Sequence, residues 1–162
     1  LSVLQLDAHA DLRDEYLGTK YGQACVMRRI FELCPIVQVG VRSLSREEKQ
    51  FLNQKKMTPF YMSDLESSTD SITQLIASLS ENVYLTIDVD VLDPSIMPAV
   101  GTPEPGGMQW RQVLDITKSV ALHKHIVGFD LMEFCPREGP ASCAFILAKL
   151  AYKLIGYAVS QG

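Results

Sequence analysis

The sequence of 162 residues lacks several features that mark whole classes of protein. No run of Lys or Arg occurs, and 15 basic against 19 acidic residues give a net charge of -4, which argues against nucleic-acid binding. None of the four cysteines forms a CxxC pair, which argues against a zinc knuckle or a redox motif. We therefore expect these cysteines to be small buried residues in a reducing compartment, and the protein to be cytoplasmic. The cysteines are Cys25, Cys34, Cys135 and Cys143.

Features that place a chain in a membrane are also absent. Leu1–Leu6 is apolar but too short to span a bilayer, and no basic segment precedes it as in a signal peptide. The apolar stretch Ala141–Val159 carries Lys149 and Lys153 four residues apart, which favours an amphipathic surface helix. The sequence has no initiator Met and opens inside a predicted strand, so we expect an N-terminal portion of the fold to be missing.

Strand and helix patterns alternate along the chain. Apolar residues make up 47% of it, enough for a substantial core. Strands are predicted at Ser2–Leu6, Ile36–Val41, Pro59–Met62, Val83–Val89 and Ile126–Leu131. Helices are predicted at Tyr21–Leu33, Ser45–Lys56, Asp70–Leu79, Trp110–Leu122 and Ala141–Val159. Near-continuous apolar strands separated by helices predict an α/β fold with a parallel sheet covered on both faces. No repeat or linker interrupts the chain, so residues 1–162 are predicted to form a single domain.

Acidic residues and one histidine follow two of the predicted strands. Asp7, His9 and Asp11 end the first strand, and Asp88 and Asp90 end the fourth. Alternate residues of an extended chain face the same way, so we expect each group to share a face. The carboxyl ends of parallel strands form the edge at which ligands bind. The two groups are therefore predicted to converge there.

Four carboxylates and an imidazole in one place would repel each other and lose hydration, unless a cation is bound. Oxygen ligands with one imidazole suit manganese or magnesium, and five ligands are too many for one tetrahedral ion. Two ions with shared carboxylates fit better, and such a pair can activate water at neutral pH. The competing interpretation, a set of helix caps and turns, suits Asp93-Pro94 but does not explain both groups together.

Several segments resemble the signatures of the ureohydrolase family, which contains arginases and agmatinases. They occur in the family's order and run the length of the chain, which covers somewhat more than half of a typical member. The segments are Asp7–Asp11, Val39–Ser43, Ile87–Pro94, Gly101–Gly107 and Gly128–Glu133. The resemblance implies a three-layer α/β/α fold of the arginase/deacetylase type, with a mostly parallel sheet that is incomplete at its N-terminus.

The resemblance also implies a cofactor of two Mn²⁺ ions per site. By motif match, Asp7 and Asp88 would bridge the ions, and His9 and Asp90 would complete the shell of one of them. Asp11 would bind the other ion and relay a proton. This ion would lack one ligand, because the family's histidine in an upstream Gly-Gly-Asp-His motif has no counterpart in the sequence.

The activity implied is hydrolysis of a guanidino compound, foremost agmatine, to urea and an amine such as putrescine. Glu133 would hold the guanidinium as a bidentate charge-assisted pair, and Thr102 would line the pocket. Arginase and guanidinobutyrase specificities stay open, although Leu12–Thr19 does not resemble the arginase loop. A pocket role and a solvated loop are equally expected for residues 13–15. Members of the family usually form trimers or hexamers, so a homo-oligomer is expected.

One departure from the family favours an alternative interpretation. Gln23 stands where the family commonly has a proton-transferring histidine, and an amide cannot act as a general acid or base. His123 and His125 lie between a helix and a strand and are expected at the surface. The alternative is therefore a metal-binding protein that is catalytically impaired. A zinc deacetylase would want a pair of histidines, and a phosphatase would want basic groups near the metals, for which Arg13 and Arg42 are the candidates.

Overall fold

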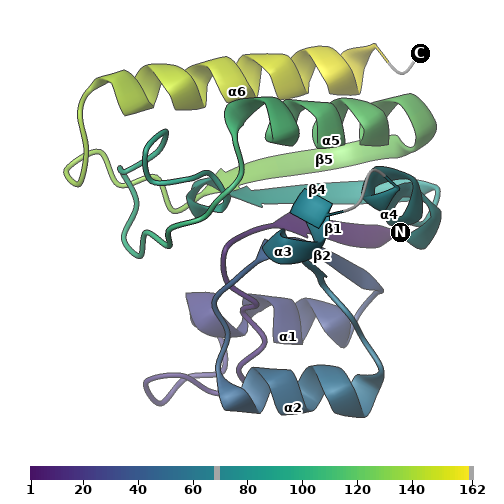
Figure 1. Ribbon diagram of the computed structural model, residues 1–162. Coiled ribbons are helices and arrows are strands. Elements are labelled where there is room, and N and C mark those ends of the chain that lie inside the picture. The colour runs from purple at the N-terminus through teal and green to yellow at the C-terminus, as the bar shows by residue number, and fades with distance from the viewer. Residues whose placement is uncertain (68–69, 161–162) are drawn as a thin grey trace.

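A computed structural model describes residues 1–67 and 70–160, apart from the side chains of residues 66 and 67. Within this part of the chain, five parallel strands form one sheet in the order β3-β2-β1-β4-β5 (Figure 1). The strands are β1 (Ser2–Leu6), β2 (Ile36–Val41), β3 (Phe60–Tyr61), β4 (Asn82–Asp88) and β5 (His125–Met132). The predicted parallel sheet is confirmed.

Helices cover both faces of this sheet. Figure 1 shows α1 and α2 on one face and α5 and α6 on the other, which makes the three layers that were predicted. The helices are α1 (Val26–Phe31), α2 (Arg46–Lys55), α3 (Met62–Ser67), α4 (Ser71–Ser78), α5 (Trp110–His123) and α6 (Ser142–Val159). Two short 3-10 turns, Gln23–Cys25 and Val89–Val91, lie before α1 and after β4.

The central strand β1 explains why the chain folds this way. All five of its residues are buried. Leu4 and Leu6 pack into the large core under α4, α5 and α6, whereas Val3 packs into a smaller core that includes Met27 and Phe51. A strand that is apolar on both faces is stable only between two helical layers. The near-continuous apolar sequence of β1 therefore places it in the middle of the sheet.

The predicted helix at Ser45–Lys56 is confirmed together with its capping box. Ser45 is the N-cap, and its side chain accepts a hydrogen bond from the backbone N–H of Glu48 while the Glu48 carboxylate accepts from the backbone N–H of Ser45. Lys56 ends the helix in the left-handed conformation, with a φ of 55°. The sequence predicts this helix well because both capping residues, Ser45 and Glu48, lie within its first turn.

Two predicted elements are shorter than expected. The helix expected at Tyr21–Leu33 begins only after Gly22, which is extended, and its regular part is α1. The strand expected at Pro59–Met62 contains only Phe60 and Tyr61, since Met62 already begins α3. Proline has no N–H to donate to a ladder, which explains the late start of this edge strand.

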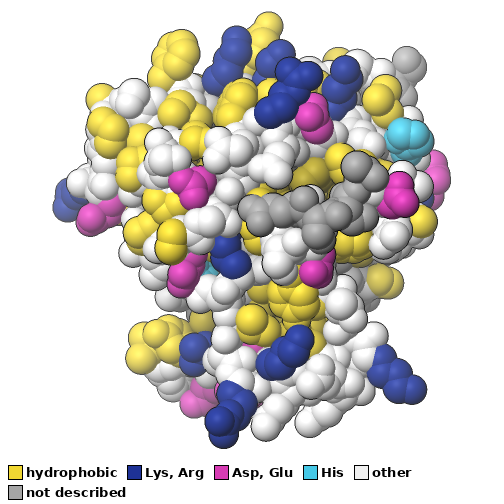
Figure 2. Space-filling model, viewed as in Figure 1, with side chains coloured by type: hydrophobic (Ala, Val, Ile, Leu, Met, Phe, Trp, Pro, Cys, Tyr) yellow, Lys and Arg dark blue, Asp and Glu magenta, His cyan; other side chains and the backbone are white. Residues whose placement is uncertain are grey.

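The last helix has one face on the protein and one face in solvent. Cys143, Leu150 and Leu154 are buried against the core, and α6 contacts α5 and β5. The opposite side mixes basic and apolar groups, as the upper surface in Figure 2 shows, and the apolar ones include Phe145 and Tyr152, which are 77% and 68% exposed. Among the described residues α6 alone is long and apolar enough to cross a bilayer, which is weak evidence because helices of soluble proteins pass the same test.

The order of the strands creates a crevice at a defined place. The chain runs from β1 outward to β2 and β3, then returns to form β4 on the other side of β1. The carboxyl ends of β1 and β4 therefore flank a topological switch point, where parallel sheets of this type bind their ligands. Both groups of acidic residues predicted from the sequence follow these two strands.

Candidate metal centre

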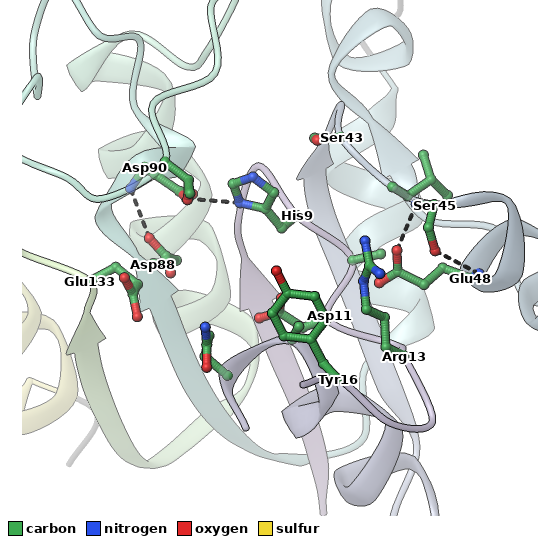
Figure 3. Close-up of a pocket in the computed structure, with 15 residues that line it drawn as sticks. His9, Asp11, Arg13, Tyr16, Ser43, Ser45, Glu48, Asp88, Asp90 and Glu133 are labelled. Carbon is green, nitrogen blue, oxygen red and sulfur yellow. Dashed lines mark hydrogen bonds and ion pairs between the residues drawn. The ribbon is translucent and has the colours of Figure 1, made fainter. Parts of the chain in front are cut away.

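The ends of β1 and β4 bring the predicted site residues together. Leu6 pairs with Ile87 in the sheet, so Asp7 and Asp88, the next residue of each strand, come to lie at the same edge. Figure 3 shows His9, Asp11, Asp88, Asp90 and Glu133 around one cavity. The convergence that the sequence predicted is therefore present in the fold.

Three of these side chains form a compact cluster. One ligand atom from each of Asp7, His9 and Asp90 lies within 4.8 Å of the other two. His9 Nδ1 is 2.9 Å from Asp90 Oδ2 and 3.6 Å from Asp7 Oδ1. Both carboxylates are buried, and each is held by the backbone: His9 N–H donates to Asp7 Oδ1 at 2.6 Å and Ala8 N–H donates to Asp90 Oδ1 at 3.1 Å.

Asp11 and Asp88 lie in the same cavity but outside this compact cluster. The strand alternation that was expected to align them does not extend this far. β1 ends at Leu6, and Asp11 has a φ of 53°, so its direction is set by a left-handed turn. Asp88 ends β4, and its Oδ1 caps the following 3-10 turn by accepting from Asp90 N–H at 3.0 Å. The residues converge because of these two turns, which alternation cannot describe.

Burial and neighbouring charges shift the pKa values of the side chains at this site. Burial, and then repulsion by Asp7 and Asp90, raise the pKa of Asp88 to about 9. Burial, and then the charge of Asp7, raise the pKa of Asp11 to about 8, and burial raises the pKa of Asp7 to about 6. Hydrogen bonds to Asp7 and Asp90 raise the pKa of His9 to about 10. Divalent cations fit such a site, because they can replace the protons that these side chains hold in the absence of metal.

These pKa shifts predict how stability depends on pH in the absence of metal. The three carboxyls have an ordinary pKa of 3.8 but about 6, 8 and 9 in the fold, so between these values the folded state binds more protons than the unfolded chain. His9, raised from 6.5 to about 10, acts in the same direction. Stability therefore falls as pH rises through this range.

The measurement is the thermal unfolding midpoint, followed by circular dichroism between about pH 5 and pH 9. This window contains most of the range over which the three carboxyls lose their protons in the fold. In EDTA we expect the midpoint to fall as pH rises. With Mn²⁺ added, the fall should be reduced, because the cation compensates the carboxylates in their charged form. A midpoint in EDTA that is flat or rises with pH would contradict these pKa shifts.

A further buried carboxylate, that of Glu48 in α2, binds the segment that follows Asp11. It is a buried charged residue, 3% exposed. Its Oε1 accepts from Leu12 N–H at 2.9 Å, and its Oε2 accepts from Ser45 N–H at 2.7 Å. The capping box is visible in the sequence, but the bond to Leu12 is not, because it joins residues 36 positions apart. Glu48 thus fixes the chain directly after Asp11.

Replacing Glu48 with alanine should destabilise the protein. The substitution removes both acceptors and leaves the buried N–H of Leu12 without a partner, which costs about 1–3 kcal/mol, plus about 1 kcal/mol for the lost cap. We expect a loss of about 2–4 kcal/mol in the free energy of unfolding, measured by urea denaturation. The matched control is Glu47→Ala at the exposed neighbour, where little change is expected. Equal urea midpoints for the two variants would contradict this role.

Arg42 and Asp93 hold the loop that carries Thr102 over the site. Arg42 Nη2 donates to the backbone carbonyls of Asp90 and Glu104, both at 2.8 Å. The Asp93 carboxylate accepts from the N–H groups of Gly106 and Gly107, both at 3.1 Å. Hydrogen bonds from Ser95, and then those from the two glycines, lower the pKa of Asp93 to about 2. The expected turn role of Asp93 is confirmed. In the sequence Arg42 is part of the family-like segment Val39–Ser43 and a candidate phosphate ligand, and its bonds to the backbone have no local signal.

A cavity of about 400 Å³ opens beside the cluster. Glu133 and Thr102 line it, as does Gln23. Glu133 follows β5 with a φ of 61°, an uncommon conformation for a glutamate, and such residues gather at functional sites. Arg13 and Tyr16 also line the cavity, with the Arg13 guanidinium 4.9 Å from the centre of the Tyr16 ring.

For the charged loop at residues 13–15, a pocket role and a solvated loop were both expected, and each holds for part of it. Arg13 lines the cavity, whereas Glu15 is exposed and Asp14 pairs with Arg29 at 2.6 Å. Elsewhere, His123 and His125 are exposed as predicted. His125 begins β5, at the opposite end of the sheet from the cavity. Cys25 and Cys143 are buried free thiols as expected, while Cys34 and Cys135 are only half-buried.

Several known proteins match this arrangement. The model of the Arginase family matches residues 1–156. An N(1)-aminopropylagmatine ureohydrolase of Synechocystis sp. is 41% identical over 96% of this chain and 52% of its own length. An agmatinase of Pyrococcus horikoshii is 40% identical over 96% of this chain and 54% of its own length. The crystal structure of the agmatine ureohydrolase of Thermoplasma volcanium has a TM-score of 0.86 and 34% identity, over 98% of this chain and 55% of that one. The chain thus spans about half the length of these relatives.

Proposed function

Because this chain belongs to the arginase family, we propose that it carries the metal-binding and guanidinium-binding part of a ureohydrolase. The reaction is hydrolysis of a guanidino compound to urea and an amine. The observation that carries the proposal is the convergence of Asp7, His9 and Asp90 with Asp11 and Asp88 at the switch point of the sheet. Turns and caps alone would not require so many buried acidic groups in one place.

The residues present fit a pair of manganese ions. Asp7, His9, Asp11, Asp88 and Asp90 would hold the pair. When bound, the pair would supply an activated water as nucleophile. Carboxylate oxygens with one imidazole are the donors that hard divalent cations prefer, which supports the assignment.

The remaining chemistry belongs to side chains of this chain. Glu133 faces the cavity and would hold the guanidinium by two charge-assisted hydrogen bonds, which positions its carbon beside the cluster. Asp11 lies in the same cavity and relays a proton to the leaving amine. The acidic lining attracts a cationic substrate. Thr102 borders the cavity at its exposed rim.

Agmatine is the first substrate that we propose, and its aminopropyl derivative is the second. The Pyrococcus relative is named an agmatinase, and the Synechocystis relative is named for N(1)-aminopropylagmatine. Both compounds end in the same guanidinium and differ in the length of the amine tail. Comparison of kcat/KM for the two compounds decides between them.

The test of the function is urea release. The protein, loaded with Mn²⁺, is assayed with agmatine, N(1)-aminopropylagmatine, arginine and guanidinobutyrate. We expect urea from the first two compounds and loss of activity after treatment with EDTA. Urea from arginine alone would reject the agmatinase-type substrate while retaining the reaction.

The impaired, metal-binding relative is a second candidate, because Gln23 lines the cavity where a proton-transferring histidine was expected. It predicts tight Mn²⁺ binding without urea from any of the four compounds, even in a longer chain that supplies the rest of the family's length. The phosphatase alternative retains only Arg13 as a basic group at the cavity, because the guanidinium of Arg42 is occupied by backbone carbonyls. The deacetylase alternative has no second histidine at the cavity within the described residues.

A further inference from the structure

Three polar side chains are buried here: two glutamines within the sheet, and Asp7 of the cluster directly after β1. Gln5 on β1 and Gln38 on β2 are direct partners in the sheet register, and they are 2% and 3% exposed. Asp7, two residues after Gln5, is 2% exposed. Buried amides destabilise a fold unless they are hydrogen-bonded, and a sheet core normally avoids them. Their presence here needs a reason.

The three side chains form one chain of hydrogen bonds. Gln38 Nε2 donates to Gln5 Oε1 at 2.6 Å and to the carbonyl of Ala10 at 2.6 Å. Gln5 Nε2 donates to Asp7 Oδ2 at 2.6 Å. The direction of this chain runs toward Asp7, because an ionised carboxylate can only accept. The other oxygen of Asp7 accepts from His9 N–H, also at 2.6 Å.

A purely structural origin does not account for this arrangement. Gln38 Oε1 is buried and has no hydrogen-bond partner among the described residues. Two leucines would avoid this unsatisfied acceptor, but they would leave Asp7 Oδ2 and the carbonyl of Ala10 without these donors, and both groups belong to the site. The pair of amides is retained at a cost in stability, and the group at the end of the chain is Asp7.

We propose that Gln5 is a positioning residue for the metal site and that Gln38 holds Gln5 in place. With one hydrogen bond on each oxygen, the Asp7 carboxylate is fixed in one orientation beside His9 and Asp90. An amide keeps its hydrogens at every pH, so it orients the carboxylate without competing for a proton. Gln38 also binds the carbonyl of Ala10, which fixes the segment leading to Asp11. The inference rests on the proposed function for its role in metal binding.

The test uses Gln5→Leu and Gln38→Leu, with Gln54→Leu on the exposed side of α2 as the matched control. Isothermal titration with Mn²⁺ should give about a 10-fold weaker affinity for Gln5→Leu, since residues that orient metal ligands typically contribute 10–100-fold. Gln38→Leu should have a smaller effect in the same direction, because Asp7 keeps its donor. The control should bind as the wild type does.

A second readout does not need metal. Hydrogen exchange of the His9 backbone amide, which donates to Asp7, should be faster in metal-free Gln5→Leu than in the wild type and the control. If wild-type protein fails to bind Mn²⁺, the proposed function fails, and this exchange rate still decides the positioning role. Unchanged Mn²⁺ affinity together with unchanged His9 exchange in a folded Gln5→Leu protein would overturn the inference.

A third readout covers the case in which Gln5→Leu does not fold. In wild-type protein with ¹⁵N-labelled glutamine, the side-chain amide of Gln5 should be protected from exchange by its bond to Asp7. The exposed Gln54 amide provides the reference for free exchange. Protection of Gln5 supports the inference, and exchange as fast as that of Gln54 overturns it.

Discussion

Asp88→Asn should weaken Mn²⁺ binding by more than about 100-fold, beyond the range seen when only a residue that orients a ligand is lost. The change keeps the size of the side chain and keeps an oxygen to accept from Asp90 N–H, but it removes the negative charge. A neutral amide oxygen is a weaker ligand for a divalent cation than a carboxylate oxygen, so binding of the proposed pair should weaken. Titration calorimetry with Mn²⁺ measures the loss, and urea release should fall with it.

Stability separates this loss from simple unfolding. Burial and the charges of Asp7 and Asp90 raise the pKa of Asp88 to about 9, so ionisation of Asp88 destabilises the metal-free fold. In EDTA at alkaline pH, Asp88→Asn should therefore unfold at a temperature no lower than that of the wild type. Asp115→Asn, on the surface of α5, is the matched control and should leave Mn²⁺ binding unchanged. Wild-type affinity in the folded Asp88→Asn protein would remove Asp88 from the metal site.

Glu133→Gln should lower kcat/KM for the guanidino substrate by about 10–100-fold, which corresponds to about 1.5–3 kcal/mol for a hydrogen bond to a charged group. The amide cannot form the bidentate pair with a guanidinium, because one of its two polar atoms is a donor. Glutamine can adopt the φ of 61° found at this position as readily as glutamate, so the backbone should be unaffected. Mn²⁺ affinity should not change.

The matched control is Glu138→Gln, an exposed position in the turn that follows β5. If the protein turns over too slowly to be assayed, binding of agmatine to the Mn²⁺-loaded form reports the same contact by calorimetry. A Glu133→Gln protein with wild-type kcat/KM and wild-type agmatine affinity would show that the guanidinium binds elsewhere. Loss of Mn²⁺ affinity would instead assign Glu133 to the metal.

The sheet could be predicted from the sequence because its strands carry a strong local signal. The bounds predicted for β1 and β2 agree with the structure, and those for β4 and β5 differ by a residue at each end. The helix α3 was missed, since it follows β3 without a break and contains only six residues. Short helices are stabilised by tertiary packing, which leaves little trace in local sequence.

The sequence predicts which residues come together at the site, but it does not predict how their side chains are oriented. Asp7, His9 and Asp90 were expected together and lie together. The expected alternation does not hold at Asp11, whose left-handed conformation is set by contacts from the far end of its loop: its carbonyl accepts from the N–H groups of residues 27 and 28. Side-chain bonds between distant segments, such as that of Glu48 to Leu12, have no signature in a single sequence.

Arg42 has a consequence for how substrate would be received. Its guanidinium joins the end of β2 to the carbonyls of Asp90 and Glu104, so the loop over the cavity is already ordered in the free protein. The conformational entropy of that loop is then lost on folding and not on association with a ligand. Because this rim is preorganised, we expect substrate to bind with little change in the loop and with a small heat-capacity change. The rate of association should then be limited by diffusion more than by loop closure.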